Sequence, residues 1–428
     1  MSVGLTLAAG TARAQALPSL DRYLRAGAAH NLDVRQRREQ ARQLAADRAV
    51  ARARLLPRLT ATATYTRNSA ETVVPVMDDD GTSALATITP RDQVDAGVGL
   101  SVPVFDLSTW SRSRAATYAA EAGALAAEGN GFDVAALVVQ AYYQYIAASA
   151  QEASARRAAT VAGEHRVVVA ANLAAGRASE LDLERAGAEV ARAHQHVADA
   201  ALARANAARS LRTLTGLDAD GSAPALPSGL DPEGPLEGWL GRVHALPDVR
   251  AEEAEARAAE ARAQAALMEY LPTVTATATV RTTNAAGFGD DTTWAAGVTA
   301  QWSLDAAVLG QTRSSRASAE VARLRAARTR RDQGDRIEDA WNQVEALRAK
   351  SAAAEAERQA GARAAVVTRG RYRAGLATQL ELIQTERDAF TAEMSHIQAL
   401  ADLAAARALL RVYAGRMDEI DSYEEGPR

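Results

Sequence analysis

The chain has 428 residues, with 49 basic and 53 acidic side chains and no cysteine. Without cysteine it can form neither disulfides nor thiolate metal sites nor cysteine-linked lipid anchors. Its nearly balanced charge gives no support to nucleic acid as a main partner, which would call for a basic patch. Only 4% of the residues are aromatic, and alanine and arginine dominate, which is typical of long helices that approach each other closely.

The N-terminus predicts export. A short apolar stretch, Val3–Ala9, is followed by an Ala-Gln-Ala tripeptide that ends at Ala16 and has the small-x-small form of a signal-peptidase site. We therefore predict a signal peptide over residues 1–16. The longest strongly apolar run, Val134–Val139, is far shorter than the ~18 residues of a membrane helix, so any membrane span should consist of strands.

An internal duplication organises the rest of the chain. Leu56–Thr64 recurs as Leu271–Thr279, and Ala174–Leu183 recurs as Arg373–Leu382, with further matches in the same order between them. The offset falls from 215 to 199 residues, so the first copy should have the longer surface loop. The predicted parts are a first repeat over 17–215, a Pro/Gly-rich linker or irregular side structure over 216–247, a second repeat over 248–415 and a tail over 416–428.

Each repeat begins with a helical segment and then contains two segments that alternate with period 2, as strands do. The predicted strands are about 58–67, 94–104, 273–283 and 293–304. Each is long enough to cross a bilayer as a tilted strand. A half-buried soluble sheet is the alternative, but it would need a cover. Because open sheet edges are not tolerated in lipid, four strands could span a membrane only by sharing a barrel with copies of the same chain.

Two long helices follow the strands, Ser108–Ala175 in the first repeat and residues 306–374 in the second. The first would extend about 100 Å at ~1.5 Å per residue. The tripeptide Gly129–Gly131 interrupts it, and we expect a kink or local unwinding there. An antiparallel helix should return after each, over Arg177–Thr215 and 378–415.

The turns at 175–179 and 374–378 have the same local pattern. A glycine stands where a left-handed residue ends a helix. Three residues later a hydroxyl residue can N-cap the next helix, and an acidic residue at the third helical position completes a capping box. These residues are Gly176, Ser179 and Asp182 in the first repeat and Gly375, Thr378 and Glu381 in the second.

No motif indicates an enzyme, a cofactor or a metal site. His194 and His196 are two residues apart, which places their rings on different faces of a helix. The acidic run Asp78–Asp80 could hold calcium, but a solvated acidic loop is the favoured interpretation. The chain contains no phosphate loop, no nucleophile elbow and no His-Glu-x-x-His motif.

The ordered set of features resembles the TolC-like outer-membrane efflux channels over about residues 17–415. The residues that carry the resemblance are Leu56-Pro57, Leu271-Pro272, Pro103–Asp106, Ala141–Tyr143, Ala340-Trp341 and Tyr372–Thr378. The resemblance implies a mainly helical mixed fold and a homotrimer, in which three chains form one twelve-stranded barrel and a twelve-helix periplasmic tunnel. It implies a passive, non-enzymatic exit duct in the outer membrane of a Gram-negative-type cell, opened by a periplasmic adaptor and an inner-membrane pump.

The same resemblance implies two sets of site residues. The adaptor-binding tips map to Gly176, Arg177, Ser179, Gly375, Leu376 and Thr378. The periplasmic gate and constriction map to Tyr372, Asp182, Glu381 and Gln384. Gln384 stands where the family has a second acidic residue, and Ala377 where it has an arginine, so fewer polar links should hold this gate.

Two other classes of protein would account for part of this pattern. An exported coiled-coil structural or interaction protein would explain the helices but not four alternating strands. A periplasmic adaptor would carry one helical hairpin flanked by small β-domains rather than two flanked by strands of spanning length. The cargo is not disclosed, because drug, metal, polysaccharide or secreted protein would all suit a passive duct.

Overall fold

The computed structural model describes residues 17–77, 83–219, 221–227, 229, 231–287, 289–303 and 305–420. The predicted signal peptide, the acidic run Asp78–Asp80 and residues 421–428 lie outside them. The chain forms two compact units. Unit 1 consists of Met1–Glu39, Ala126–Val249 and Thr329–Arg428, and unit 2 of Gln40–Leu125 and Arg250–Arg328. Each unit contains portions of both sequence repeats, so the two units do not correspond to the two repeats.

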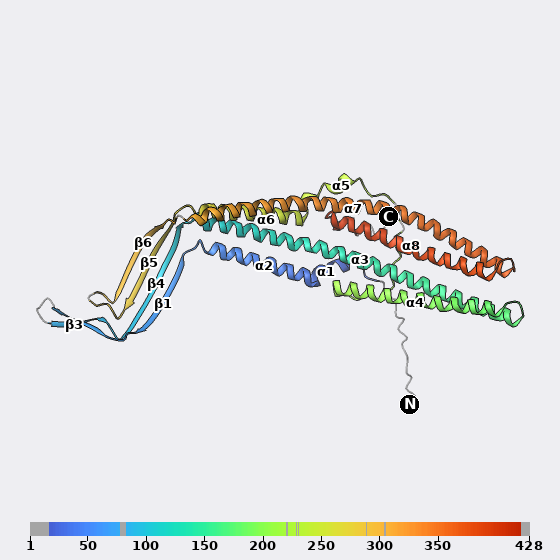
Figure 1. Ribbon diagram of the computed structural model, residues 1–428, viewed down its shortest axis with the longest axis horizontal. Helices are drawn as coiled ribbons and strands as arrows, with labels where there is room; N and C mark the ends of the chain where they lie inside the picture. The colour runs from blue at the N-terminus through green and yellow to red at the C-terminus, as the bar shows by residue number, and fades with distance from the viewer. Residues whose placement is uncertain are drawn as a thin grey trace, which may run out of the picture. The chain divides into compact units, whose positions relative to one another are not determined.

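The fold is mainly helical with a small proportion of strands, which confirms the predicted fold class (Figure 1). In chain order the elements are α1 (Leu20–His30), α2 (Leu32–Ala53), β1 (Arg58–Arg67), β2 (Thr72–Met77), β3 (Ser83–Thr89), β4 (Asp92–Phe105), α3 (Leu107–Ala174), α4 (Glu180–Thr215), α5 (Leu236–Leu240), η1 (Val243–Ala245), α6 (Pro247–Met268), β5 (Thr273–Thr283), β6 (Thr292–Gln301), α7 (Ala306–Arg373), α8 (Gln379–Tyr413) and η2 (Met417–Glu419).

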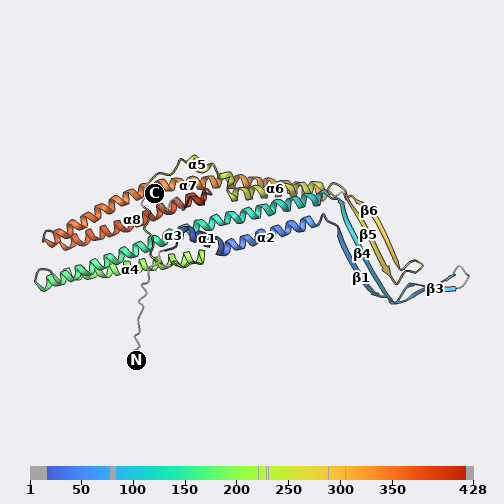
Figure 2. The same ribbon diagram turned by 180° about the vertical axis from the view of Figure 1, so that it is seen from behind.

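Unit 2 contains an antiparallel sheet of four strands in the order β1-β4-β5-β6. The central pair, β4 and β5, joins the first repeat to the second. Every residue of the outer strands β1 and β6 is exposed, so no helix covers the sheet on either face there, and the four strands lie side by side in both views (Figures 1 and 2). A soluble sheet of this kind would leave its apolar face in water.

The last strand of the sheet ends earlier than the predicted 293–304. β6 stops at Gln301, because the next residue, Trp302, turns to donate its indole N–H to the Tyr270 carbonyl at 2.9 Å. Asp305 then accepts the backbone N–H of Ala307 at 2.8 Å and begins α7. β4 is longer than the predicted strand 94–104 and runs from Asp92 to Phe105.

The long inter-strand segment of the first repeat is not simply a loop. β2 and β3 pair there as a separate two-stranded antiparallel sheet, which corrects the expectation of a surface loop. β2 has three valines and a threonine, and β3 has two threonines and an isoleucine; such β-branched residues favour extended backbone. The extra length of the first repeat therefore forms a hairpin of its own.

The glycines inside α3 do not unwind it. α3 is continuous from Leu107 to Ala174, which corrects the expected unwinding at Gly129–Gly131. A side chain at Gly129 would instead have its Cβ within van der Waals overlap of the Asp248 carboxylate. Another segment of the chain thus approaches the helix closely at this glycine, and a larger side chain would displace the Asp248 carboxylate.

One described helix, α3, has a stretch of mean hydropathy 1.2 and is long enough to cross a bilayer on composition alone. This is a weak indication, because core helices meet the same criterion. In α3 the apolar residues Val134, Val138, Val139 and Ile146 are buried in the main core of unit 1. We therefore assign this stretch to the protein interior.

In unit 1 the second part of α3 runs beside α4, and the second part of α7 runs beside α8, so that each pair forms a helical hairpin (Figures 1 and 2). Ion pairs link the partners within each hairpin. Arg204 of α4 lies 3.0 Å from Glu152 of α3, and Arg369 of α7 lies 2.6 Å from Glu386 of α8. The two hairpins end in the predicted turns.

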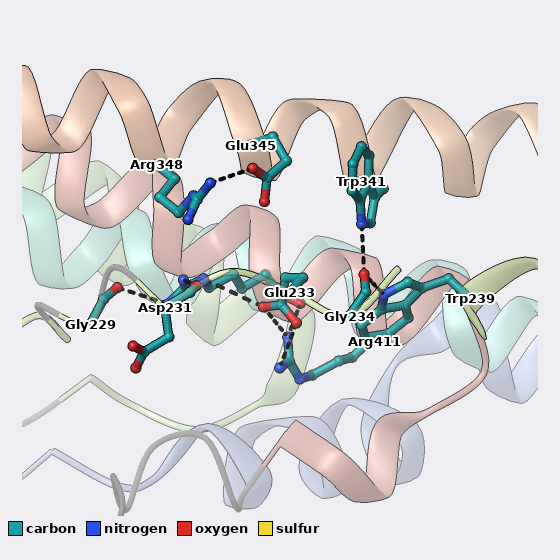
Figure 3. Close-up of polar contacts among 10 residues, drawn as sticks. Gly229, Asp231, Glu233, Gly234, Trp239, Trp341, Glu345, Arg348 and Arg411 are labelled. Carbon is teal, nitrogen blue, oxygen red and sulfur yellow. Dashed lines mark hydrogen bonds and ion pairs between the residues drawn. The ribbon is translucent and has the colours of Figure 1, made fainter. Parts of the chain in front are cut away.

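The segment between the repeats is an irregular side structure rather than a free linker (Figure 3). Trp239 of α5 is 4% exposed, and Trp341 of α7 donates its indole N–H to the Gly234 carbonyl at 3.0 Å. Arg407 of α8 is 1% exposed and donates to the Gly229 carbonyl at 2.8 Å and to the Asp231 carbonyl.

The Glu233 carboxylate completes this attachment. It lies 3.4 Å from the Arg407 guanidinium and 3.2 Å from that of Arg411, and all three side chains are largely shielded from solvent. The arginines thus satisfy the polar groups of a segment that has little regular structure, which fixes it against α7 and α8.

Candidate functional site

The sheet has two chemically different faces. Residues directly opposite each other on paired strands share a face, and successive residues of one strand alternate between faces. One such row is Ala61, Val98, Val280 and Trp294. The neighbouring rows on this face are also largely apolar, and many of its side chains are exposed, up to 79% for Trp294.

The opposite face is polar and made of small side chains. Its central row runs Thr62, Gly97, Arg281 and Thr293, and the next row runs Thr60, Gly99, Thr279 and Ala295. One ion pair interrupts it, between the Arg281 guanidinium and the Asp95 carboxylate at 2.5 Å.

The apolar face has the height of a bilayer core. On β4 it runs from Val94 to Val104, ten residue steps, or about 34 Å at ~3.4 Å per residue. With the ~45° tilt of membrane strands this becomes about 24 Å, close to the ~25 Å apolar band of membrane barrels. Tyr65 lies near one end and directs its hydroxyl to Asp92 at 2.7 Å, and Trp302 lies near the other.

The two sheet edges, β1 and β6, pair with no strand among the described residues of this chain. A membrane sheet cannot leave a row of backbone N–H and C=O groups facing lipid, since each unsatisfied group costs several kcal/mol. The sheet is therefore incomplete as a membrane structure.

The hairpin turns have the backbone geometry that their sequence predicts. Gly176 and Gly375 adopt φ of 70° and 73°. The Gly176 N–H bonds to the Leu173 carbonyl at 2.9 Å and the Arg177 N–H to the Asn172 carbonyl at 2.8 Å, which together form a Schellman motif. The second turn repeats it, with Gly375 bonded to Tyr372 and Leu376 to Arg371.

Both capping boxes are confirmed. The Ser179 hydroxyl accepts the Asp182 N–H at 3.2 Å, and the Asp182 carboxylate accepts the Ser179 N–H at 3.0 Å. In the second turn the Thr378 hydroxyl accepts the Glu381 N–H at 3.2 Å, and Glu381 accepts the Thr378 N–H at 2.7 Å. These backbone hydrogen bonds lower the pKa of both carboxyl groups, so both stay ionised.

Of the predicted gate residues, the structure places Tyr372 near Asp182, and Tyr372 also contacts His165, which was not predicted. Tyr372 of α7 meets His165 of α3 edge to face, with ring centroids 5.4 Å apart. Burial raises the pKa of the Tyr372 phenol, with a smaller contribution from the Asp182 charge. Gln384 is exposed on α8, and Glu381 is held in its capping box. The adaptor-tip residues Arg177 and Leu376 are exposed, the latter by 69%.

Sequence reasoning missed the residues that join the two hairpins. Gln379, which is buried, donates its amide to the Asp182 carbonyl at 2.8 Å. Arg387 of α8 donates to the Glu189 carboxylate of α4 at 2.9 Å. Neither contact could be predicted from the sequence. Gln379 is simply a polar residue after an N-cap, and Arg387 and Glu189 are 198 residues apart.

Among the described residues no group of three or more histidine, aspartate or glutamate side chains could hold a metal ion. His196 packs against the Phe390 ring at 5.3 Å, so it serves a hairpin contact. The acidic run Asp78–Asp80 lies outside the described residues.

Comparisons with known proteins agree on one family. The model of the family described as outer membrane efflux protein matches residues 23–217 and 245–416. No curated protein is similar enough in sequence to count as a match.

Several solved structures have the same fold. A membrane protein from Pseudomonas aeruginosa is 23% identical, with a TM-score of 0.79 and 92% of each chain covered. The Campylobacter jejuni CmeC outer membrane channel is 16% identical, with a TM-score of 0.81 and coverage of 98% of this chain and 94% of that one. The open state of the Neisseria gonorrhoeae MtrE outer membrane channel is 21% identical, with a TM-score of 0.78 and coverage of 94% and 90%.

Proposed function

Because this chain belongs to the outer membrane efflux protein family and is an efflux channel of the outer membrane, we propose that three copies assemble into its conducting form. Each copy contributes four strands to one closed barrel of twelve, and its two helical hairpins to a periplasmic tunnel. The channel is a passive duct without catalytic residues or a cofactor. The comparisons lend no support to a coiled-coil interaction protein or an adaptor.

One observation carries this proposal, the four-stranded sheet with an apolar face, a polar face and two open edges. Membrane barrels begin at about eight strands, so four strands cannot close alone. Pairing β6 of one copy with β1 of the next satisfies both edges and places the apolar face toward lipid. The threonine-rich face then lines the lumen.

A pair of arginine substitutions tests this arrangement. Val298 and Thr299 are neighbours in β6 and lie on the apolar and polar faces. An arginine on the lipid face near the bilayer midplane costs about 2–4 kcal/mol, whereas one on the lumen face does not. We expect Val298→Arg to lower the yield of heat-dissociable trimer in outer membranes sharply and Thr299→Arg to leave it unchanged. Equal yields, or a monodisperse monomer by light scattering of the parent, would contradict the barrel.

We assign adaptor docking to the exposed tips, at Gly176, Arg177, Ser179, Gly375, Leu376 and Thr378. A β-branched residue at the left-handed Gly375 is strongly disfavoured, so Gly375→Val should abolish export while trimer levels stay normal. Gly370→Val is the matched control, because Gly370 is helical and an added side chain meets open space. Normal export in Gly375→Val would remove the tip from the mechanism.

We assign the inner constriction to Tyr372, Asp182, Glu381 and Gln384. Threefold symmetry would bring three Glu381 carboxylates around one axis, where they would attract cations. Glu381→Gln retains a capping side chain but removes this charge. The expected result is loss of cation selectivity in planar bilayers with unchanged trimer stability. Retained selectivity, together with destabilisation by Glu381→Ala, would show that Glu381 is a helix cap alone.

A further inference from the structure

A cleft of about 960 Å³ lies within unit 1 between the two helical hairpins, near their turns. Helices α3 and α4 line one side and α7 and α8 the other. Its volume falls within the ~300–1,000 Å³ typical of sites for small molecules. Part of the lining is apolar and could hold a flat hydrocarbon body; it comprises Val161, Val168, Leu382, Ile383 and Phe390.

The charged part of the lining is predominantly basic. Six arginines and three glutamates line the cleft, whereas the whole chain has a net charge of −4. Two of the glutamates are already engaged. Glu189 accepts hydrogen bonds from both Arg192 at 3.0 Å and Arg387 at 2.9 Å, and Glu386 accepts from Arg369 at 2.9 Å.

Because Arg192 and Arg387 share the Glu189 carboxylate, some of their N–H donors remain available to a ligand. Each guanidinium has five N–H groups in a fixed fork that suits carboxylate, sulfonate or phosphate oxygens. Glu393, which does not line the cleft, forms only a long ion pair with Arg157, with 3.8 Å between the guanidinium nitrogen and the carboxylate oxygen. An added anion would therefore meet a surplus of positive charge.

A buried polar atom also lines the cleft. The Nε2 atom of His165 is shielded from solvent and has no hydrogen-bond partner among the described residues. Its ring is held edge to face against Tyr372, and burial lowers the pKa of the imidazole, which favours the neutral form. Leaving such an atom unsatisfied is unfavourable, and a polar group of a ligand would relieve that cost.

From this lining we infer that the cleft binds a small anionic amphiphile, with a flat apolar body and one carboxylate, sulfonate or phosphate group. The body would lie against the apolar residues, and the anionic group would bond to the guanidiniums around Glu189. Because the ligand would touch both hairpins, it would link them in one position near their turns. Three of its lining residues, Arg177, Gly375 and Tyr372, belong to the tips and the constriction proposed above, so the cleft adjoins both.

Isothermal titration calorimetry tests the inference directly, with the full-length protein held in amphipol so that no free detergent competes. The probe is naphthalene-1-sulfonate, and the neutral comparison is 1-naphthalenemethanol. Ala162→Trp fills the cleft from its lining, while Ala170→Trp, on an exposed position of the same helix outside the lining, is its control. Arg387→Gln removes a donor but leaves Glu189 paired with Arg192, and Arg166→Gln, outside the lining, is its control.

We expect one saturable sulfonate site per chain, bound at least tenfold more weakly by Ala162→Trp and at least fivefold more weakly by Arg387→Gln. Both controls should match the parent, and the neutral probe should bind at least tenfold more weakly. No saturable binding, equal affinity for the neutral probe, or parental affinity in both cleft variants would overturn the inference. The cleft lies within one chain, so the two proposals can fail separately. Absence of sulfonate binding would not contradict the trimeric channel, and a monomeric parent protein could still be tested for binding in the cleft.

Discussion

The interiors of the two units are built from different side chains. In unit 1 the cluster beneath α5 combines large residues such as Trp239, Ile337, Leu403 and Leu410. In unit 2 a buried cluster joins α6 to α7 with alanine alone: Ala256, Ala259, Ala263, Ala319, Ala322 and Ala326. A leucine buries far more apolar area than an alanine methyl group.

This difference shows that the helices inside each unit are held together in different ways. The alanines of each helix are spaced by three and four residues, so they form one narrow stripe that lets two helices approach closely. Such a contact gains little energy from each residue and tolerates no added volume. Unit 1 instead depends on large apolar residues and on buried arginines that attach the segment between the repeats.

The largest expected effect is at the buried ion pairs of unit 1. Glu233→Ala would leave Arg407, which is 1% exposed, and Arg411 without their carboxylate. Removing one partner of a buried pair costs about 3–5 kcal/mol, because the remaining buried charge loses its counter-ion. We expect a lower unfolding temperature and faster hydrogen exchange in α8. Glu237→Ala, at an exposed position nearby, should have little effect; equal effects of both would mean that the buried pair adds no stability.

A large-to-small substitution in unit 1 and a small-to-large substitution in unit 2 test this difference between the two interiors. Leu410→Ala in unit 1 should cost about 2–5 kcal/mol through a cavity, whereas Ala322→Leu in unit 2 should cost about 1–3 kcal/mol through overpacking. Peptide-resolved hydrogen exchange assigns each loss to its own unit. The matched control is Ala327→Leu, which is exposed on the same helix as Ala322. If Ala322→Leu stabilised unit 2, the alanine contact would be loose rather than close-packed.

The smallest expected effect concerns pH. Hydrogen bonds from Arg358, and then from Gln359, lower the pKa of the half-buried Glu355 carboxyl from 4.5 to about 2. A depressed folded-state pKa stabilises the fold above the unfolded-state value, and this stabilisation is lost as the pH falls from about 4.5 toward 2. Glu355→Gln should therefore flatten the pH dependence of the unfolding temperature slightly in that window. The same change at the exposed Glu357 should leave it as in the parent, and a steeper dependence in Glu355→Gln would refute the assignment.

Features that depend on residues close together in the chain could be predicted from the sequence. The left-handed glycines, Gly176 and Gly375, and both capping boxes depend on residues within one turn of each other, so their patterns predicted the observed geometry. Strand alternation depends only on the two-residue period of extended backbone, and it identified the two faces of the sheet. The roles of the tip and gate residues stay proposals.

The tertiary structure decided features that join distant residues. A kink or local unwinding was expected at Gly129–Gly131, but α3 is continuous there, and the carboxylate of Asp248, 119 residues after Gly129, lies against the helix. The attachment of the linker by Arg407, the bond between Gln379 and Asp182, and the cleft between the hairpins also join segments far apart in the chain. Local propensity and periodicity carry no information about such contacts, because their energy comes from side chains that meet only after the helices have packed.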